Sequence, residues 1–158
     1  MKVYIASDHA GFELKEKITQ YFKDYYDFED LGPNTNDRVD YPDFAIKLSQ
    51  KINRNTNKNK DQKINQDSLG ILVCGSGQGV CMTANKFSHI RAALCTNEEL
   101  AELSRAHNNA NVLCLGSRTV SDDLNLKIVK RFLTTEFEGG RHQARVDKMS
   151  RASLKESL

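Results

Sequence analysis

A glycine-rich turn directly after a short apolar run, in residues 69–80 (LGILVCGSGQGV), constrains the fold more than any other part of the chain. Residues 71–73 have the composition of a buried strand, and the residues after Gly79 have that of a helix start. Cys74 closes the strand, so its thiol is expected beside backbone N–H groups and a helix N-terminus. Such a place favours anions and lowers a thiol pKa, which suits a nucleophile or a base.

The same alternation of strand and helix continues through most of the chain. Strands are expected at 2–7, 28–31, 70–74, 90–95 and 111–115. Helices are expected at 11–25, 44–52, 80–87, 98–108 and 121–137, and from 143 onward, with Asn97 as an N-cap. Five strands alternating with helices predict an α/β fold with a parallel sheet covered on both faces.

Polar side chains follow several of the predicted strands. They lie in segments 7–9, 74–77, 95–97 and 116–118. In open parallel sheets, ligands bind beyond the carboxyl ends of the strands. The sequence therefore predicts a site for a small polar ligand at this edge of the sheet.

The overall composition is that of a soluble globular protein, and we expect one domain over residues 1–158. The net charge of +2 gives no strong attraction to nucleic acid, and no apolar run is long enough to cross a membrane. The four cysteines lack CxxC spacing, and no secretory signal is present, which favours the cytosol. Cys95 and Cys114 are expected to be buried. Residues 53–67, rich in Asn, Lys and Gln, are expected to form a flexible surface insertion.

Known cofactor motifs do not match this chain. Gly75, Gly77 and Gly79 give GxGxG, which is neither a dinucleotide fingerprint nor a Walker A loop, and which suits one phosphate or one oxyanion better. The histidines, which show no HxH, HxxxH or HExxH pairing, are His9, His89, His107 and His142. His89 is expected to lie in a surface turn. No metal or nucleotide cofactor is predicted, although a Cys74/His107/Asp8 metal site stays conceivable.

Two further features allow both a functional and a structural interpretation. Arg141 and Arg145 have the i,i+4 spacing that puts two guanidinium groups on one helical face, where they could clasp a phosphate or form a solvated basic face. His107, at a predicted helix end, is either a helix-stabilising residue or a catalyst.

Long segments of the chain resemble one known family. The matching stretches are SDHAGFELK (7–15), DYPDFA (40–45), GILVCGSGQGVCMTANKFSHIRA (70–92), LSRAHNNANVLCLGSR (103–118) and FEGGRHQARV (137–146). They resemble the ribose-5-phosphate isomerase B family, which includes galactose- and allose-6-phosphate isomerases. The resemblance implies a three-layer α/β/α sandwich with a Rossmann-like five-stranded parallel sheet. It also implies interconversion of ribose 5-phosphate and ribulose 5-phosphate through a cis-enediol, without metal or nucleotide, in the non-oxidative pentose phosphate pathway.

The resemblance further implies roles for single residues. Cys74 matches the catalytic base, and His107 matches the acid that opens the sugar ring. Ser76 matches a hydroxyl that, with backbone groups of the loop, stabilises the enediolate; the loop residues are Gly75, Ser76, Gly77, Gln78 and Gly79. The other matched substrate contacts are Asp8, His9 and Asn108 near the sugar, and Arg118, Arg141 and Arg145 near the phosphate. Relatives form sites between subunits, so a homodimer or a dimer of dimers is implied.

Two alternatives stay open at this point. One is a six-carbon substrate, such as allose 6-phosphate or galactose 6-phosphate, because the sequence does not reveal the depth of the pocket. The other is a catalytically silent sugar-phosphate-binding protein, although a binder has no need of both Cys74 and His107.

Overall fold

The structure is a computed structural model, and it describes residues 1–53 and 68–152. Five parallel strands form one sheet in the order β2-β1-β3-β5-β4. The strands are β1 (Lys2–Ser7), β2 (Asp27–Asp30), β3 (Ser68–Cys74), β4 (Ala92–Leu94) and β5 (Val112–Gly116). The helices are α1 (Phe12–Phe22), α2 (Tyr41–Asn53), α3 (Gln78–Ala84), α4 (Glu98–Ala106), α5 (Asp122–Thr134) and α6 (Arg141–Ala152).

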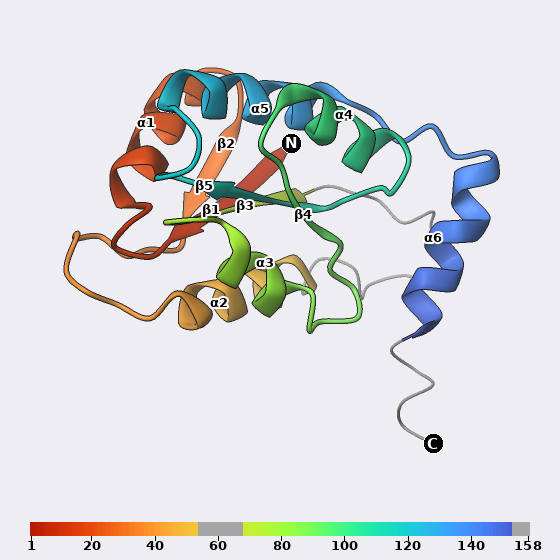
Figure 1. The fold of residues 1–158 in the computed structure, drawn as a ribbon, viewed down its shortest axis with the longest axis horizontal. Coiled ribbons are helices and arrows are strands. Elements are labelled where there is room, and N and C mark those ends of the chain that lie inside the picture. The colour runs from red at the N-terminus through yellow and green to blue at the C-terminus, as the bar shows by residue number, and fades with distance from the viewer. Residues whose placement is uncertain (54–67, 153–158) are drawn as a thin grey trace.

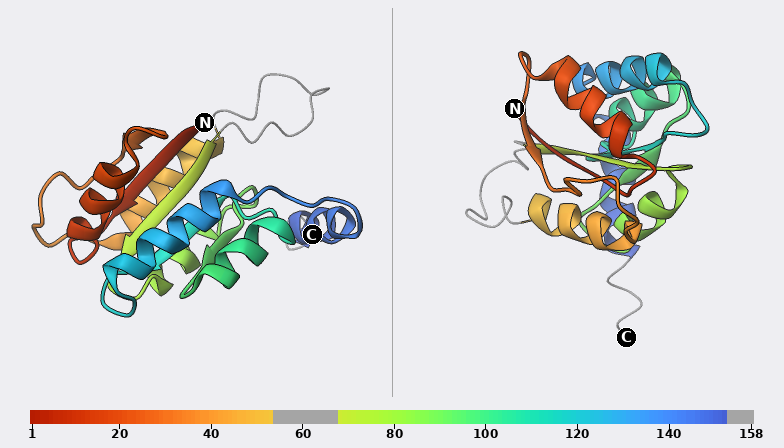
Figure 2. Two further views of the ribbon diagram at one scale, coloured as in Figure 1. Left: turned by 90° about the horizontal axis from the view of Figure 1, so that it is seen from above. Right: turned by 90° about the vertical axis from the view of Figure 1, so that its left-hand side faces the viewer.

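The sheet lies between two layers of helices (Figures 1 and 2). Helices α1, α4 and α5 cover one face, and α2 and α3 cover the other. One apolar cluster fills each interface, because successive strand residues point to opposite faces: Ile5 joins the first cluster and Ala6 the second. Helix α6 belongs to neither layer and stands apart at one end of the molecule (Figure 1). The expected three-layer α/β/α architecture is therefore confirmed.

The central strand fixes the edges of the sheet. All seven residues of β3 are buried, as expected for a parallel strand covered on both faces. Its register pairs Ser7 of β1 with Val73, and Cys74 with Gly116 of β5. The carboxyl ends of β1, β3 and β5 therefore lie side by side at one edge of the sheet.

The predicted strands and helices are all present, with shifted ends. Helix α5 ends at Thr134 rather than at 137, because Thr135 adopts an extended conformation. Helix α6 begins at Arg141, two residues earlier than expected. Asn97 caps α4 as predicted, and its Oδ1 accepts a hydrogen bond of 2.8 Å from the Leu100 N–H.

One sequence expectation needs correction, and another lies outside the described residues. His89 lies in a turn as expected, but it is half-buried rather than on the surface, and its Nε2 lies 2.9 Å from the Ser49 carbonyl oxygen of α2. The predicted insertion at 53–67 falls outside the described residues, apart from Asn53, the last residue of α2. Among the described helices, none is both long and apolar enough to span a membrane.

The buried aromatic ring of Phe132 offers a test of the core on the α1/α4/α5 face. Phe132 is fully buried, whereas Tyr25 is 77% exposed. We predict that Phe132→Ala lowers the free energy of unfolding by about 3–5 kcal/mol, because it removes apolar contacts and leaves a cavity. Tyr25→Ala should change it by less than about 0.5 kcal/mol. Urea unfolding of both variants measures the difference, and equal losses would contradict this assignment of the core.

Candidate functional site

Three loops meet at the carboxyl edge of the sheet. The loop after β1 is held to β3, because the Asp8 N–H donates to the Val73 carbonyl oxygen at 3.1 Å. The loop after β5 is held to both, because the Ser117 N–H donates to the Cys74 carbonyl at 2.9 Å and the Ser117 hydroxyl to the Ala10 carbonyl at 2.7 Å. Gly11 permits this close approach, since a Cβ there would lie 2.6 Å from the Val73 oxygen.

These loops line an open cavity of about 440 Å³ at the surface. It is lined by Asp8, His9, Ala10, Tyr41, Cys74, Gly75, Ser76, Gly79, Arg118 and Thr119. We call this set the thiol half-site. The cavity brings together most of the predicted site residues near Cys74. Gly77 and Gln78, which were also predicted, belong to the same loop but do not line the cavity. Tyr41 and Thr119 were not predicted, because an aromatic residue at a helix start and a threonine after a strand carry no chemical signal in sequence.

Cys74 lies where the sequence places it, at the carboxyl end of β3 and beside the start of α3. Its side chain is buried, and Sγ accepts a hydrogen bond of 3.1 Å from the Gly77 N–H. Gly77 provides this contact in a left-handed conformation (φ 76°) that residues with a Cβ rarely adopt. This contact fixes the position of the sulfur at the edge of the cavity.

The remaining polar groups of the thiol half-site face the cavity edge. Asp8 is buried, and its Oδ1 accepts a hydrogen bond of 2.9 Å from the Gly11 N–H. Ser76 and Arg118 are exposed. The first backward hydrogen bond of α3 joins the Cys81 N–H to the Gly77 carbonyl, so the N–H groups of the preceding turn have no acceptor within the helix. An anion at this position would meet these donors and the Arg118 guanidinium.

The other predicted residues lie at the opposite edge of the sheet. Helix α4 returns the chain from the end of β4 to the start of β5, and His107 and Asn108 follow it. Helix α5 returns the chain in the same way, and the Glu138 N–H then donates to the Ala106 carbonyl at 3.1 Å. The residues gathered at this edge are His107, Asn108, Glu138, Arg141, His142 and Arg145, which we call the histidine half-site.

The two half-sites of one chain are well separated. Strand β5 has five residues and rises about 3.3 Å per residue, so its ends lie about 13 Å apart. Cys74 pairs with Gly116 at the far end of this strand, whereas His107 precedes its first residue. A metal site of Cys74, His107 and Asp8 within one chain is therefore excluded.

The histidine half-site contains a carboxylate and two imidazoles in contact. The rings of His107 and His142 are stacked, with centroids 4.3 Å apart and planes within 5° of parallel. Glu138 Oε2 lies 3.7 Å from Nε2 of His107 and 3.6 Å from Nε2 of His142. Burial lowers the pKa of His142, and the neighbouring His107 and Arg141 lower it further.

These three side chains have the spacing of metal ligands but not the orientation. One ligand atom from each lies within 4.8 Å of the others. The ligating lone pair of an imidazole nitrogen lies in the ring plane, and two parallel planes do not converge on one ion. The arrangement is therefore not suited to holding one metal ion between the two rings.

The guanidinium groups of both half-sites lack acidic partners. Within residues 1–53 and 68–152, no carboxylate is paired with Arg118, Arg141 or Arg145. Arg141 and Arg145 are both exposed on the first turns of α6, with the predicted i,i+4 spacing. Cationic side chains without an acidic partner at a helix N-terminus are suited to an anionic ligand.

The other three thiols differ from one another in ways that the sequence does not reveal. Burial raises the pKa of Cys95 to about 11 and raises that of Cys114 well above its usual value. Both residues are buried, as expected. Cys81 is only half-buried, and a hydrogen bond with Cys114 lowers its pKa to about 7.

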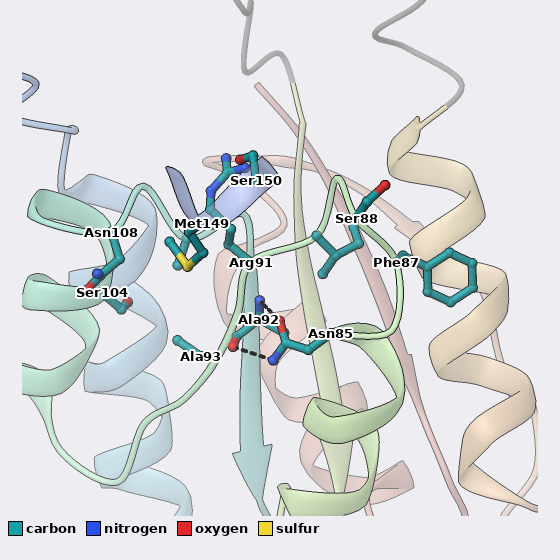
Figure 3. A pocket seen from close by; sticks show the side chains of 12 residues that line it. Asn85, Phe87, Ser88, Arg91, Ala92, Ala93, Ser104, Asn108, Met149 and Ser150 are labelled. Atoms are coloured by element: carbon teal, nitrogen blue, oxygen red, sulfur yellow. Dashed lines mark hydrogen bonds between the residues drawn. The ribbon is translucent and has the colours of Figure 1, made fainter. Parts of the chain in front are cut away.

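A larger cavity of about 580 Å³ lies away from the thiol half-site (Figure 3). Asn85 and Phe87 after α3, the start of β4, and Asn108 line one side, and Met149 and Ser150 of α6 close the other. The side chain of Asn85 is held to the Ala92 backbone by two hydrogen bonds of 2.9 Å, drawn as dashed lines in Figure 3. This cavity forms a groove beside α6. It borders the histidine half-site, because Asn108 is one of its lining residues.

A family model described as Ribose/Galactose Isomerase matches residues 3–149 of this chain. The chain belongs to the ribose/galactose isomerase family. A Mycoplasma genitalium protein named probable ribose-5-phosphate isomerase B is 50% identical over 151 residues, which cover 94% of this chain and 93% of that protein. The family resemblance seen in the sequence is thus confirmed.

Solved structures of ribose/galactose isomerases agree with the fold. Ribose-5-phosphate isomerase B of Clostridium thermocellum has a TM-score of 0.89 and 42% identity, covering 99% of each chain. The Mycoplasma genitalium enzyme with bound ribulose 5-phosphate has a TM-score of 0.86 and 46% identity, covering 99% of this chain and 97% of that one.

Gly77 and Gly139 allow a matched test of the loop that holds Cys74. Both have a positive φ, 76° and 66°. A Cβ at Gly77 would lie 2.9 Å from the Leu115 carbonyl carbon, whereas a Cβ at Gly139 would meet nothing within 4 Å. We predict that Gly139→Ala costs about 1–2 kcal/mol of stability. Gly77→Ala should cost about 1–3 kcal/mol more, because the clash is with backbone. Equal losses in urea unfolding would show that this loop is not closely packed.

Proposed function

We propose that this protein is a ribose-5-phosphate isomerase that interconverts ribose 5-phosphate and ribulose 5-phosphate. The observation that carries the proposal is Cys74, a buried thiol at a strand end, whose sulfur accepts a backbone N–H and borders a cavity with Arg118. The names of the relatives, and the ribulose 5-phosphate bound to the Mycoplasma genitalium enzyme, support this substrate.

In the proposed reaction, Cys74 acts as the base at the open-chain sugar. The thiolate removes the proton from C2, and the C2–H electron pair forms a C1–C2 double bond while the aldehyde oxygen becomes an oxyanion. The first-turn N–H groups of α3 and the Ser76 hydroxyl stabilise this negative charge. The thiol then returns the proton to C1, and the O2 proton moves to O1 as the C2 carbonyl forms.

We infer further that one active site needs two copies of the chain. His107 and Asn108 match family positions for ring opening and for contact with the sugar, yet they lie at the sheet edge opposite Cys74. A second chain related by a two-fold axis can present its histidine half-site to the first chain's thiol half-site, and the reverse. Helix α6 projects from the sandwich, and the cavity beside it borders the histidine half-site, so both are placed to contact a second chain.

The unpaired cations divide the phosphate contacts between the two chains. Arg118 belongs to the thiol half-site, and Arg141 and Arg145 belong to the histidine half-site. In the composite site all three guanidinium groups bind the phosphate, with Asp8 and His9 near the sugar. We also propose a cytosolic location, supported by the free thiols Cys74, Cys81, Cys95 and Cys114.

We predict that Cys74→Ala lowers kcat on ribose 5-phosphate by about 10²–10⁴-fold, because the proton-transferring group is removed. Binding of ribose 5-phosphate, measured by calorimetry, should persist, since the arginines remain. Cys95→Ala is the matched control and should keep near-wild-type turnover. Rates of isomerisation of allose 6-phosphate and galactose 6-phosphate, measured like those of ribose 5-phosphate with EDTA present, test whether the chain prefers a six-carbon sugar. A wild-type chain that turns over none of these sugars would contradict the proposed function.

Mixing two inactive variants tests whether the site is shared. Cys74→Ala inactivates only the thiol half-site, and His107→Asn inactivates only the histidine half-site. After random exchange half of the dimers are mixed, and each mixed dimer holds one intact composite site, so about a quarter of wild-type activity should appear above that of the separate variants. A site built within one chain predicts no gain on mixing.

A further inference from the structure

Glu138 and His142 contact His107 but have no role in the function proposed so far. His142 is buried, with 6% of its surface exposed, whereas the His107 side chain is 37% exposed. Two glycines in the left-handed region, Gly139 (φ 66°) and Gly140 (φ 53°), turn the chain between Glu138 and α6. This turn brings the His142 ring onto the His107 ring.

His142 is held in place by its neighbours. Arg141 Nε–H donates to His142 Nε2 at 3.4 Å, and Glu138 Oε2 lies 3.6 Å from the same nitrogen. Burial lowers the pKa of His142, and the neighbouring His107 and Arg141 lower it further, which favours its neutral form. The buried ring of His142 therefore forms a fixed flat surface against which the His107 ring stacks.

The carboxylate of Glu138 orients the His107 ring. Its Oε2 lies 3.7 Å from His107 Nε2. The segment is fixed, because the Glu138 N–H donates to the Ala106 carbonyl one residue before His107. With Nε2 directed toward the carboxylate, the other ring nitrogen, Nδ1, is left to face the sugar, as in other carboxylate-oriented histidines.

We propose that Glu138 and His142 are positioning residues that hold the His107 ring in the orientation it needs to open the sugar ring. This inference rests on the proposed function and on the ring-opening role of His107. In that step His107 donates a proton to the ring oxygen, and the bond from this oxygen to C1 breaks with its electron pair left on the oxygen. The O1 proton passes to water, and an aldehyde forms at C1.

The test separates ring opening from the later proton transfer. Ribose 5-phosphate is largely cyclic, whereas ribulose 5-phosphate is an open chain, because its 5-oxygen is esterified. Uptake of deuterium from D₂O into C1 of ribulose 5-phosphate therefore reports the Cys74 chemistry without ring opening. Isomerisation of ribose 5-phosphate requires both steps.

We expect Glu138→Gln to lower kcat/KM on ribose 5-phosphate about tenfold or more, with deuterium uptake unchanged. The matched control is Glu136→Gln, which removes an equal charge from an exposed side chain two residues away and should alter neither rate.

Two substitutions of His142 test the stacking itself. His142→Ala should lose about tenfold on ribose 5-phosphate, and His142→Phe, which keeps a flat ring, should recover most of that loss. Equal losses in isomerisation and deuterium uptake, or no loss on ribose 5-phosphate, would overturn the positioning role. If His107→Asn itself lowers both rates equally, the ring-opening role of His107 fails and this inference with it. A wild-type chain inactive in both assays refutes the proposed function instead.

Discussion

The direction of the parallel sheet is the constraint on which the rest of the structure depends. Because all five strands run the same way, every connecting helix must carry the chain back to the amino edge. Residues at the start of a helix therefore lie at one edge of the sheet, and residues at its end lie at the other. Cys74 and Ser76 precede α3, whereas His107 follows α4. Topology alone thus keeps the thiol and the imidazole a strand length apart.

Much of the fold and of the thiol half-site could be predicted from the sequence. The apolar run before Cys74 and the glycines after it have local causes, since a buried parallel strand is continuously apolar and a tight loop needs residues without a Cβ. The N-cap Asn97 is equally local, because one side chain meets an N–H three residues later. Features of this kind depend on neighbours in sequence, and a single sequence contains them.

The histidine half-site is different, because its contacts join distant segments. His107 and His142 are 35 residues apart, and their stacking depends on α5 and on two left-handed glycines. In the sequence, His142 follows Arg141, and this position indicates only that it belongs to a helix with phosphate-binding arginines. The lowered pKa of Cys81 likewise comes from Cys114 on another element. No periodicity in the sequence encodes such pairs, and the role of Glu138 becomes visible only with the backbone in place.

The turn at Gly139 and Gly140 has a consequence for how this protein family can change. A Cβ at either residue would meet nothing within 4 Å, so the two glycines themselves are not closely packed. Helix α6, which carries Arg141 and Arg145, follows this turn and lies outside both layers of the sandwich. The position of α6 therefore depends on the torsion angles of this turn and on the stacking of His142 on His107, and no described residue of α6 belongs to either apolar cluster. Adaptation to a longer or shorter sugar and maintenance of the fold are, in this architecture, separable problems.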